Sequence, residues 1–121
     1  MKKTALLAFL IGLTIQAFIA GILGKLEVIT ISSGQQFTAA SMLAILAALF
    51  LLAAVLSNQE IFLIQVIEFS GMAAQALLSG ILIDAGILDI ATYQLQLNLG
   101  IVYLLVAATL AWEWRDEIKF S

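Results

Sequence analysis

The sequence predicts an all-α integral membrane protein, a bundle of four transmembrane helices in one domain of residues 1–121. Hydrophobic residues make up 64% of the chain and charged residues only 11%, whereas a soluble domain carries about a quarter charged residues. A chain this short, folded as a water-soluble globule, could not hide so many apolar side chains. Four stretches are each long and apolar enough to cross the hydrocarbon core, which takes about 20 residues.

The first stretch covers residues 4–23 and contains no charge. The Lys2-Lys3 pair before it is typical of the start of a secretory signal peptide. No small-x-small cleavage site follows, however, because Phe18-Ile19-Ala20 stands before Gly21. We therefore expect this segment to be the first span and not a cleaved signal peptide.

The other three spans are expected at residues 39–56, 61–83 and 95–112. Residues 57–60 (Ser-Asn-Gln-Glu) form a tight loop, which predicts that the second and third helices are antiparallel neighbours. Small residues four apart predict close-packing faces, and they include Ala17 with Gly21 and Ala76 with Gly80. The sequence offers no evident internal repeat, so we expect one four-helix unit.

The placement of Lys and Arg predicts the orientation in a cell membrane. With both termini in the cytoplasm, Lys2, Lys3, Arg115 and Lys119 lie on the inner side and only Lys25 lies outside. Such a bias requires an even number of spans. Two tryptophans next to Arg115 also fit an inner boundary, where amphipathic rings prefer to lie.

Several function classes are disfavoured by what the chain lacks. It has no Cys and no His, which removes disulfides, thiol catalysis, Cys/His metal sites and His-based acid–base chemistry. Hydrolase, kinase and phosphate-loop motifs are missing, and five Lys and Arg with a net charge of −3 disfavour nucleic acid as a partner. We expect a non-enzymatic protein with no cofactor and no metal, whose partners are the lipid bilayer and other membrane subunits or copies of itself.

Glu68 is the residue in the spans that most needs an explanation. It lies about 10 Å inside the third span, where a carboxylate costs about 2.5–3.5 kcal/mol on insertion scales. No Lys, Arg or His lies in any span to pair with it. The group must therefore face protein or water, or take up a proton, and we expect Gln or hydroxyl partners.

Helical spacing places further polar residues on the face of Glu68. Gln65 lies three residues before it, Gln75 seven after and Ser79 eleven after, and these spacings share one side of a helix. We call Gln65, Glu68, Gln75 and Ser79 the polar seam. Gln16 in the first span lies close to the depth of Gln75, so a hydrogen bond between the two is expected.

Two interpretations of the polar seam remain open. In the first, its side chains hydrogen-bond between helices or to a partner, each for about 0.6–2 kcal/mol. In the second, Glu68 binds and releases a proton or small cation. The preferred function is accordingly a non-enzymatic subunit that packs within a larger membrane complex, in which Glu68 could contribute to a proton or cation path. The alternative is a small self-sufficient ion transporter or channel that acts as a homo-oligomer.

Residues 58–78, NQEIFLIQVIEFSGMAAQALL, resemble the second helix of the small K subunit of respiratory complex I and of the related C subunit of Mrp-type cation antiporters. Glu68 would match the membrane-embedded carboxylate of that family, and residues 95–111 are similar in texture to the last helix of the antiporter subunit. The resemblance implies a proton-path subunit within a large complex. The chain departs from the family by an additional first span, by Val66-Ile67 in place of Gly-Leu, and by the lack of a second embedded Glu in its fourth span.

Overall fold

The computed structural model describes residues 2–26, 33–85 and 93–117. These ranges contain four helices, α1 (Lys2–Lys25), α2 (Ser33–Ser57), α3 (Glu60–Asp84) and α4 (Tyr93–Glu113). Each is long and apolar enough to cross a membrane, because each consists of at least five turns of mostly apolar residues. The predicted class, an all-α bundle of four membrane-spanning helices, is confirmed.

All four predicted spans lie inside observed helices, and the largest difference is at the start of α2. α2 begins at Ser33 instead of residue 39, and α4 begins at Tyr93 instead of residue 95. The polar run Gly34-Gln35-Gln36 was expected in a loop because of its composition. It is helical because Gln36 packs into the interior, where only 3% of the residue is exposed.

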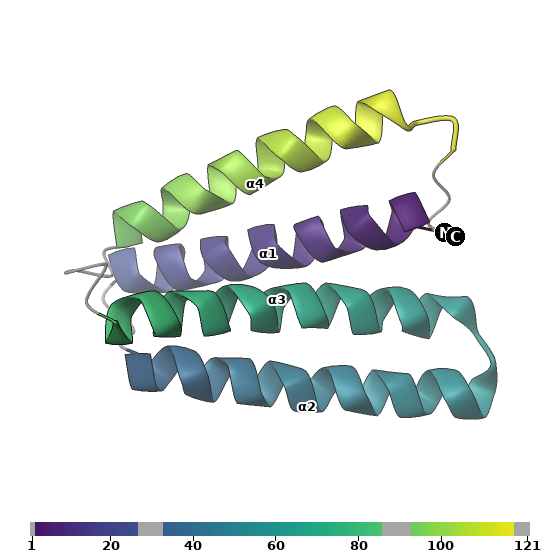
Figure 1. The fold of residues 1–121 in the computed structure, drawn as a ribbon, viewed down its shortest axis with the longest axis horizontal. Helices are drawn as coiled ribbons and strands as arrows, with labels where there is room; N and C mark the ends of the chain where they lie inside the picture. The colour runs from purple at the N-terminus through teal and green to yellow at the C-terminus, as the bar shows by residue number, and fades with distance from the viewer. Residues whose placement is uncertain (1, 27–32, 86–92, 118–121) are drawn as a thin grey trace.

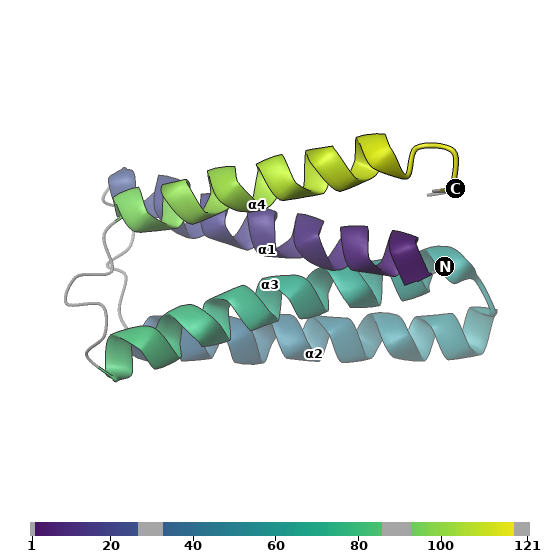
Figure 2. The ribbon, with the colours of Figure 1, turned by 45° about the horizontal axis from the view of Figure 1, so that its top comes forward.

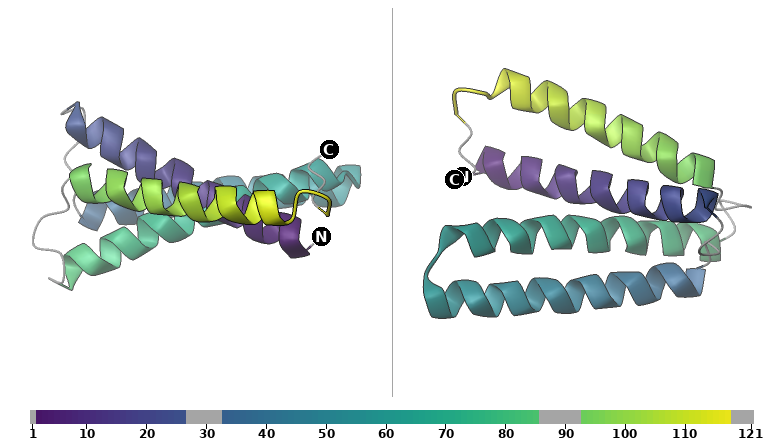
Figure 3. Two further views of the ribbon diagram at one scale, coloured as in Figure 1. Left: turned by 90° about the horizontal axis from the view of Figure 1, so that it is seen from above. Right: turned by 180° about the vertical axis from the view of Figure 1, so that it is seen from behind.

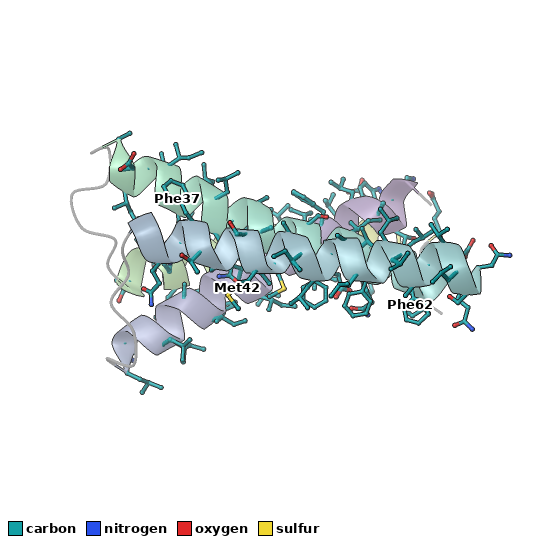
Figure 4. All side chains as sticks on the ribbon, turned by 90° about the horizontal axis from the view of Figure 1, so that it is seen from below. Phe37, Met42 and Phe62 are labelled. Carbon is teal, nitrogen blue, oxygen red and sulfur yellow. The ribbon has the colours of Figure 1, made fainter. Side chains whose placement is uncertain are left out.

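The helices form a single row in the order α4, α1, α3, α2 (Figure 1). α1 packs on α3 and on α4, and α2 packs on α3; among the described residues no other pair of helices makes close backbone contacts. Large apolar side chains cover the outer helices, such as Val55 on α2 and Leu105 on α4, which are 72% and 62% exposed. Figure 4 shows the side chains of α2 projecting outward along its length. This surface is suited to lipid.

α1 and α3 run in one direction, and α2 and α4 run in the other (Figures 1 and 2). We call the end at which α1 and α3 begin the terminal end, and the end at which α2 and α4 begin the opposite end. At the terminal end the predicted tight loop joins α2 to α3, which pack as antiparallel neighbours. Asn58 allows this turn with a left-handed φ of 57°, and its amide donates to the Ala54 carbonyl over 2.9 Å.

α1 and α3 cross in an X at the centre of the row (Figure 3, left), and two glycines make the crossing. A Cβ added to Gly12 would lie 2.1 Å from the Glu68 carbonyl oxygen, and one added to Gly71 would lie 2.3 Å from the Phe9 carbonyl oxygen. Both positions therefore exclude any side chain. The same close approach of backbones is typical of small residues in membrane helix pairs.

This crossing contact is reciprocal and reveals an internal repeat, so the prediction of a chain without one is wrong. Gly12 meets Glu68 and Met72, while Gly71 meets Phe9 and Leu13; adding 59 to each α1 residue number gives its α3 counterpart. In a two-fold arrangement, when residue i contacts residue j, the equivalent of i also contacts the equivalent of j. The two pairs of contacts at the crossing have this relation. Because α1 and α3 are parallel, this pseudo-two-fold axis runs along the helices, as in parallel membrane repeats.

The same pseudo-two-fold axis also relates the outer helices α2 and α4. Gly21 of α1 lies against Leu97 of α4, and its counterpart Gly80 of α3 lies against Phe37 of α2; Phe37 and Leu97 are 60 residues apart. Figure 4 shows Phe37 where α2 meets α3. The repeat is also visible in the central letters, since GLTIQAFIAGIL (residues 12–23) and GMAAQALLSGIL (residues 71–82) share Gly, Gln, Ala, Gly, Ile and Leu in register.

The two halves of the repeat are interlocked. α1 has no close backbone contact with α2, and α3 has none with α4, within the described ranges. Each outer helix instead packs on the central helix of the other half. The first half therefore has no packed core without the second, and the molecule is one four-helix unit.

Candidate functional site

Most of the buried polar side chains in the described chain lie between the helices in the half of the molecule near the opposite end. Four are glutamines, one from each helix. Gln16, Gln36, Gln75 and Gln96 are 7%, 3%, 1% and 1% exposed. Gln16 and Gln75 are equivalent in the repeat, as are Gln36 and Gln96. We call these four residues the glutamine layer.

In the second half of the repeat the glutamine layer is held by hydrogen bonds. Gln75 Nε2 donates to Gln96 Oε1 and to Ser79 Oγ, both over 3.4 Å. Gln96 Nε2 donates to Ser79 Oγ over 3.1 Å, and the Tyr103 hydroxyl donates to Gln75 Oε1 over 2.7 Å. These side chains bridge α3 and α4, whose backbones stay apart.

In the first half, the hydrogen bond expected between Gln16 and Gln75 is absent, and that expectation is wrong. Gln75 is engaged by Gln96, Ser79 and Tyr103 instead, because the crossing at Gly12 and Gly71 makes α1 and α3 diverge toward the opposite end (Figure 3, left). Within the described residues the side chains of Gln16 and of Gln36 make no hydrogen bond. The equivalents of Ser79 and Tyr103 are Ala20 and Leu43, which carry no hydroxyl group.

The structure divides the predicted polar seam at Gly71. Gln75 and Ser79 lie in the core, whereas Gln65 and Glu68 are only partly buried. Of the six buried residues of α3, only Ile64 precedes Gly71. The seam was predicted to be one site because its members share a helix face, and the crossing of α1 over α3 is what separates them.

Glu68 belongs to the pair of seam residues, Gln65 and Glu68, that is only partly buried. In the described part of the chain its carboxyl group makes no hydrogen bond and no ion pair, so the expected Gln or hydroxyl partner is missing. The ion pair that the structure does describe joins Lys3 to Glu117 at the terminal end. Both of those side chains are exposed, so this pair contributes little to stability.

The glutamine layer and its partners Ser79 and Tyr103 together form what we call the polar cluster. Three of its members, Gln36, Gln96 and Tyr103, were not predicted from the sequence. Gln36 was expected in a loop, and Gln96 and Tyr103 carry no charge that would single them out in a span. The spacing of the glutamines could have identified them, because Gln16 and Gln36 recur as Gln75 and Gln96 at offsets of 59 and 60.

The cluster can donate and accept hydrogen bonds but contains no titratable group other than the Tyr103 phenol. Its chemistry is that of neutral polar recognition between helices. The described residues hold no group of three or more acidic side chains that could bind a metal ion.

The fold and the buried cluster together define a multi-pass membrane protein of four helices. No protein family model matches the chain, no curated protein matches it, and no solved structure matches it.

Proposed function

We propose that this chain is a non-enzymatic membrane subunit that packs against another membrane protein through the surface around Glu68. The observation that carries the proposal is the position of this carboxyl group. It lies eight residues, or about 12 Å, from the start of α3, it is only partly buried, and nothing in the described chain pairs with it. A carboxylate that faced hydrocarbon there would cost about 2.5–3.5 kcal/mol.

A facing protein would remove this cost, because it can supply hydrogen-bond donors or a cation. The polar neighbour Gln65, three residues earlier and also partly buried, extends the same surface. We call the surface made by Gln65 and Glu68 the acidic face. Membrane helices associate through such interhelical hydrogen bonds as well as through packing.

The flat arrangement of the helices favours a subunit over a channel made by one copy. A row of four helices encloses no central path, so any proton or cation path through Glu68 would be completed by what lies against the acidic face. The resemblance of residues 58–78 to a proton-path subunit supports this role for Glu68. The alternative is a homo-oligomer in which the facing protein is another copy of this chain.

Gentle detergent extraction, followed by native mass determination and identification of every co-purifying chain, tests the proposal. Unrelated chains in fixed stoichiometry are the expected result, and those chains would name the pathway. A defined oligomer of this chain alone would instead favour the transporter alternative, and a monomer would contradict both.

Glu68→Gln separates a structural role from an ion-handling role, because it keeps hydrogen bonding and shape but removes the titratable group. A role in ion handling predicts lost flux with intact assembly. A purely structural contact predicts that both survive. The matched control is Glu60→Gln at the exposed start of α3, which should change neither.

We also propose that the terminal end faces the cytoplasm. Lys3 and Arg115 lie at this end, next to Lys2, whereas Lys25 lies at the opposite end. Trp112 is 71% exposed, and the Arg115 guanidinium stacks over its ring at 4.4 Å. An exposed aromatic ring paired with a basic group fits the membrane boundary.

A further inference from the structure

The two halves of the glutamine layer have the same scaffold but different hydrogen-bonding partners. The pseudo-two-fold axis relates α1 and α2 to α3 and α4, as the paired contacts of Gly12 with Gly71 and of Gly21 with Gly80 demonstrate. Under this relation Gln16 and Gln36 are the equivalents of Gln75 and Gln96, whose amides lie 3.4 Å apart. The second half thus serves as a template for the first.

In that template two hydroxyl groups complete the hydrogen bonding. Ser79 Oγ accepts from both glutamine amides, and the Tyr103 hydroxyl donates to the remaining amide oxygen. The first half has methyl groups at the equivalent positions, from Ala20 and Leu43. A leucine is also smaller than a tyrosine, so the exchange removes the hydroxyl group and reduces the volume of the side chain at this position.

The unpaired amides of the first half need partners. As whole residues Gln16 is 93% buried and Gln36 is 97% buried, since 7% and 3% remain exposed, but their amide atoms are not among the fully enclosed atoms without a partner. Each amide offers two donors and an acceptor that a small molecule can reach. The hydrocarbon chains of lipid cannot satisfy them, and an unsatisfied polar group in hydrocarbon costs several kcal/mol. A buried molecule that makes two to four hydrogen bonds is the usual solution at such a place.

We infer that Gln16 and Gln36 form a binding site for a neutral hydroxyl-bearing molecule, which takes the places of the Ser79 and Tyr103 hydroxyl groups. Water is the smallest such ligand, and the hydroxyl of a small alcohol or a glycerol group has the same chemistry. A charged ligand does not suit the site, because no charged residue belongs to the glutamine layer. The inference does not depend on the proposed partner at the acidic face.

A high-resolution crystal structure of the full chain tests the site, with crystals grown in a monoacylglycerol host and in bicelles that lack free glycerol groups. We expect a density peak within hydrogen-bonding distance of both the Gln16 and Gln36 amides, and none between Gln75 and Gln96. A compact peak in both hosts would identify water. An extended feature that appears only in the monoacylglycerol host would identify the lipid hydroxyl.

Amides of Gln16 and Gln36 that bond directly to each other or to protein groups, with no density beside them, would overturn the inference. Two variants sharpen the result. Ala20→Ser should displace the bound molecule by restoring the template hydroxyl, and the matched change Ser79→Ala should create a second density peak between Gln75 and Gln96. Should either variant fail to fold, the wild-type density still decides.

Discussion

At the scale of single residues, the structure depends on where side chains are missing as much as on where they are present. Gly12 and Gly71 permit the crossing of the two central helices, and the Tyr103 hydroxyl completes the hydrogen bonds of a buried glutamine. Both features are local and interhelical, so single substitutions should reveal them in the stability of the folded protein.

Gly12→Ala and Gly71→Ala should each destabilise the fold by about 1–3 kcal/mol, the usual cost of overpacking. The added methyl group would overlap a backbone carbonyl of the facing helix, which cannot move aside as a flexible side chain can. Reversible unfolding in mixed micelles, followed by circular dichroism, measures this change.

Gly34→Ala is the matched control, because a Cβ at Gly34 meets nothing within 4 Å. It should be neutral, or stabilising by up to about 1 kcal/mol, since alanine favours a helix over glycine. Equal effects at all three glycines would contradict the proposed role of the crossing.

Tyr103→Phe should cost about 0.6–1.7 kcal/mol, the range measured for hydrogen bonds between membrane helices. The substitution keeps the ring but leaves the buried Gln75 oxygen without its 2.7 Å donor. Thr109→Val is a suitable control in the same helix, because the exposed Thr109 hydroxyl bonds only to its own turn at the Leu105 carbonyl. A loss at Thr109 as large as at Tyr103 would argue against the interhelical bond.

At the scale of elements, the sequence predicted the existence and type of all four helices well. A run of about 20 apolar residues in a membrane forms a helix, because hydrocarbon cannot hydrogen-bond to the backbone and a helix satisfies its backbone groups internally. The predicted start of α2, at residue 39 instead of Ser33, is wrong because the polar residues Gln35 and Gln36 favour a loop when only the sequence is considered. Polarity alone cannot distinguish a residue in a loop from one that points into a polar core.

The connection between α2 and α3 gives a prediction of its own. Asn58 has a positive φ, a conformation that asparagine and glycine tolerate and that β-branched residues resist. Asn58→Val should therefore destabilise the protein by about 1–2 kcal/mol, whereas Asn58→Gly should change little. Thermal unfolding in detergent compares the two, and equal stability of both variants would contradict the turn geometry.

At the scale of the whole molecule, the row of helices and its pseudo-two-fold axis could not be read from the pattern of spans. Apolar periodicity identifies helices, but the lipid-facing and protein-facing sides of such apolar helices are much alike. Helical spacing places Gln65, Glu68, Gln75 and Ser79 toward one side of α3, yet only Gln75 and Ser79 are buried. Their division into a core pair and a surface pair arises from the crossing of α1 over α3, which depends on Gly12 of α1 as well as on Gly71 of α3.

The orientation of the molecule can be tested with single cysteines, since the natural chain contains none. Ser57→Cys at the terminal end and Gly34→Cys at the opposite end are both exposed positions. An impermeant thiol reagent added to intact cells should modify position 34 and reach position 57 only after the membrane is opened. The reverse pattern would place the termini outside.

We expect a protein, and not lipid, to cover the acidic face. Photo-cross-linking in native membranes tests this expectation. A photoreactive amino acid in place of Gln65 leaves Glu68 intact, and one in place of Val55, on the 72% exposed outer side of α2, is the control. We expect a discrete protein adduct from position 65 and only lipid adducts from position 55. Lipid adducts alone from position 65 would contradict the account.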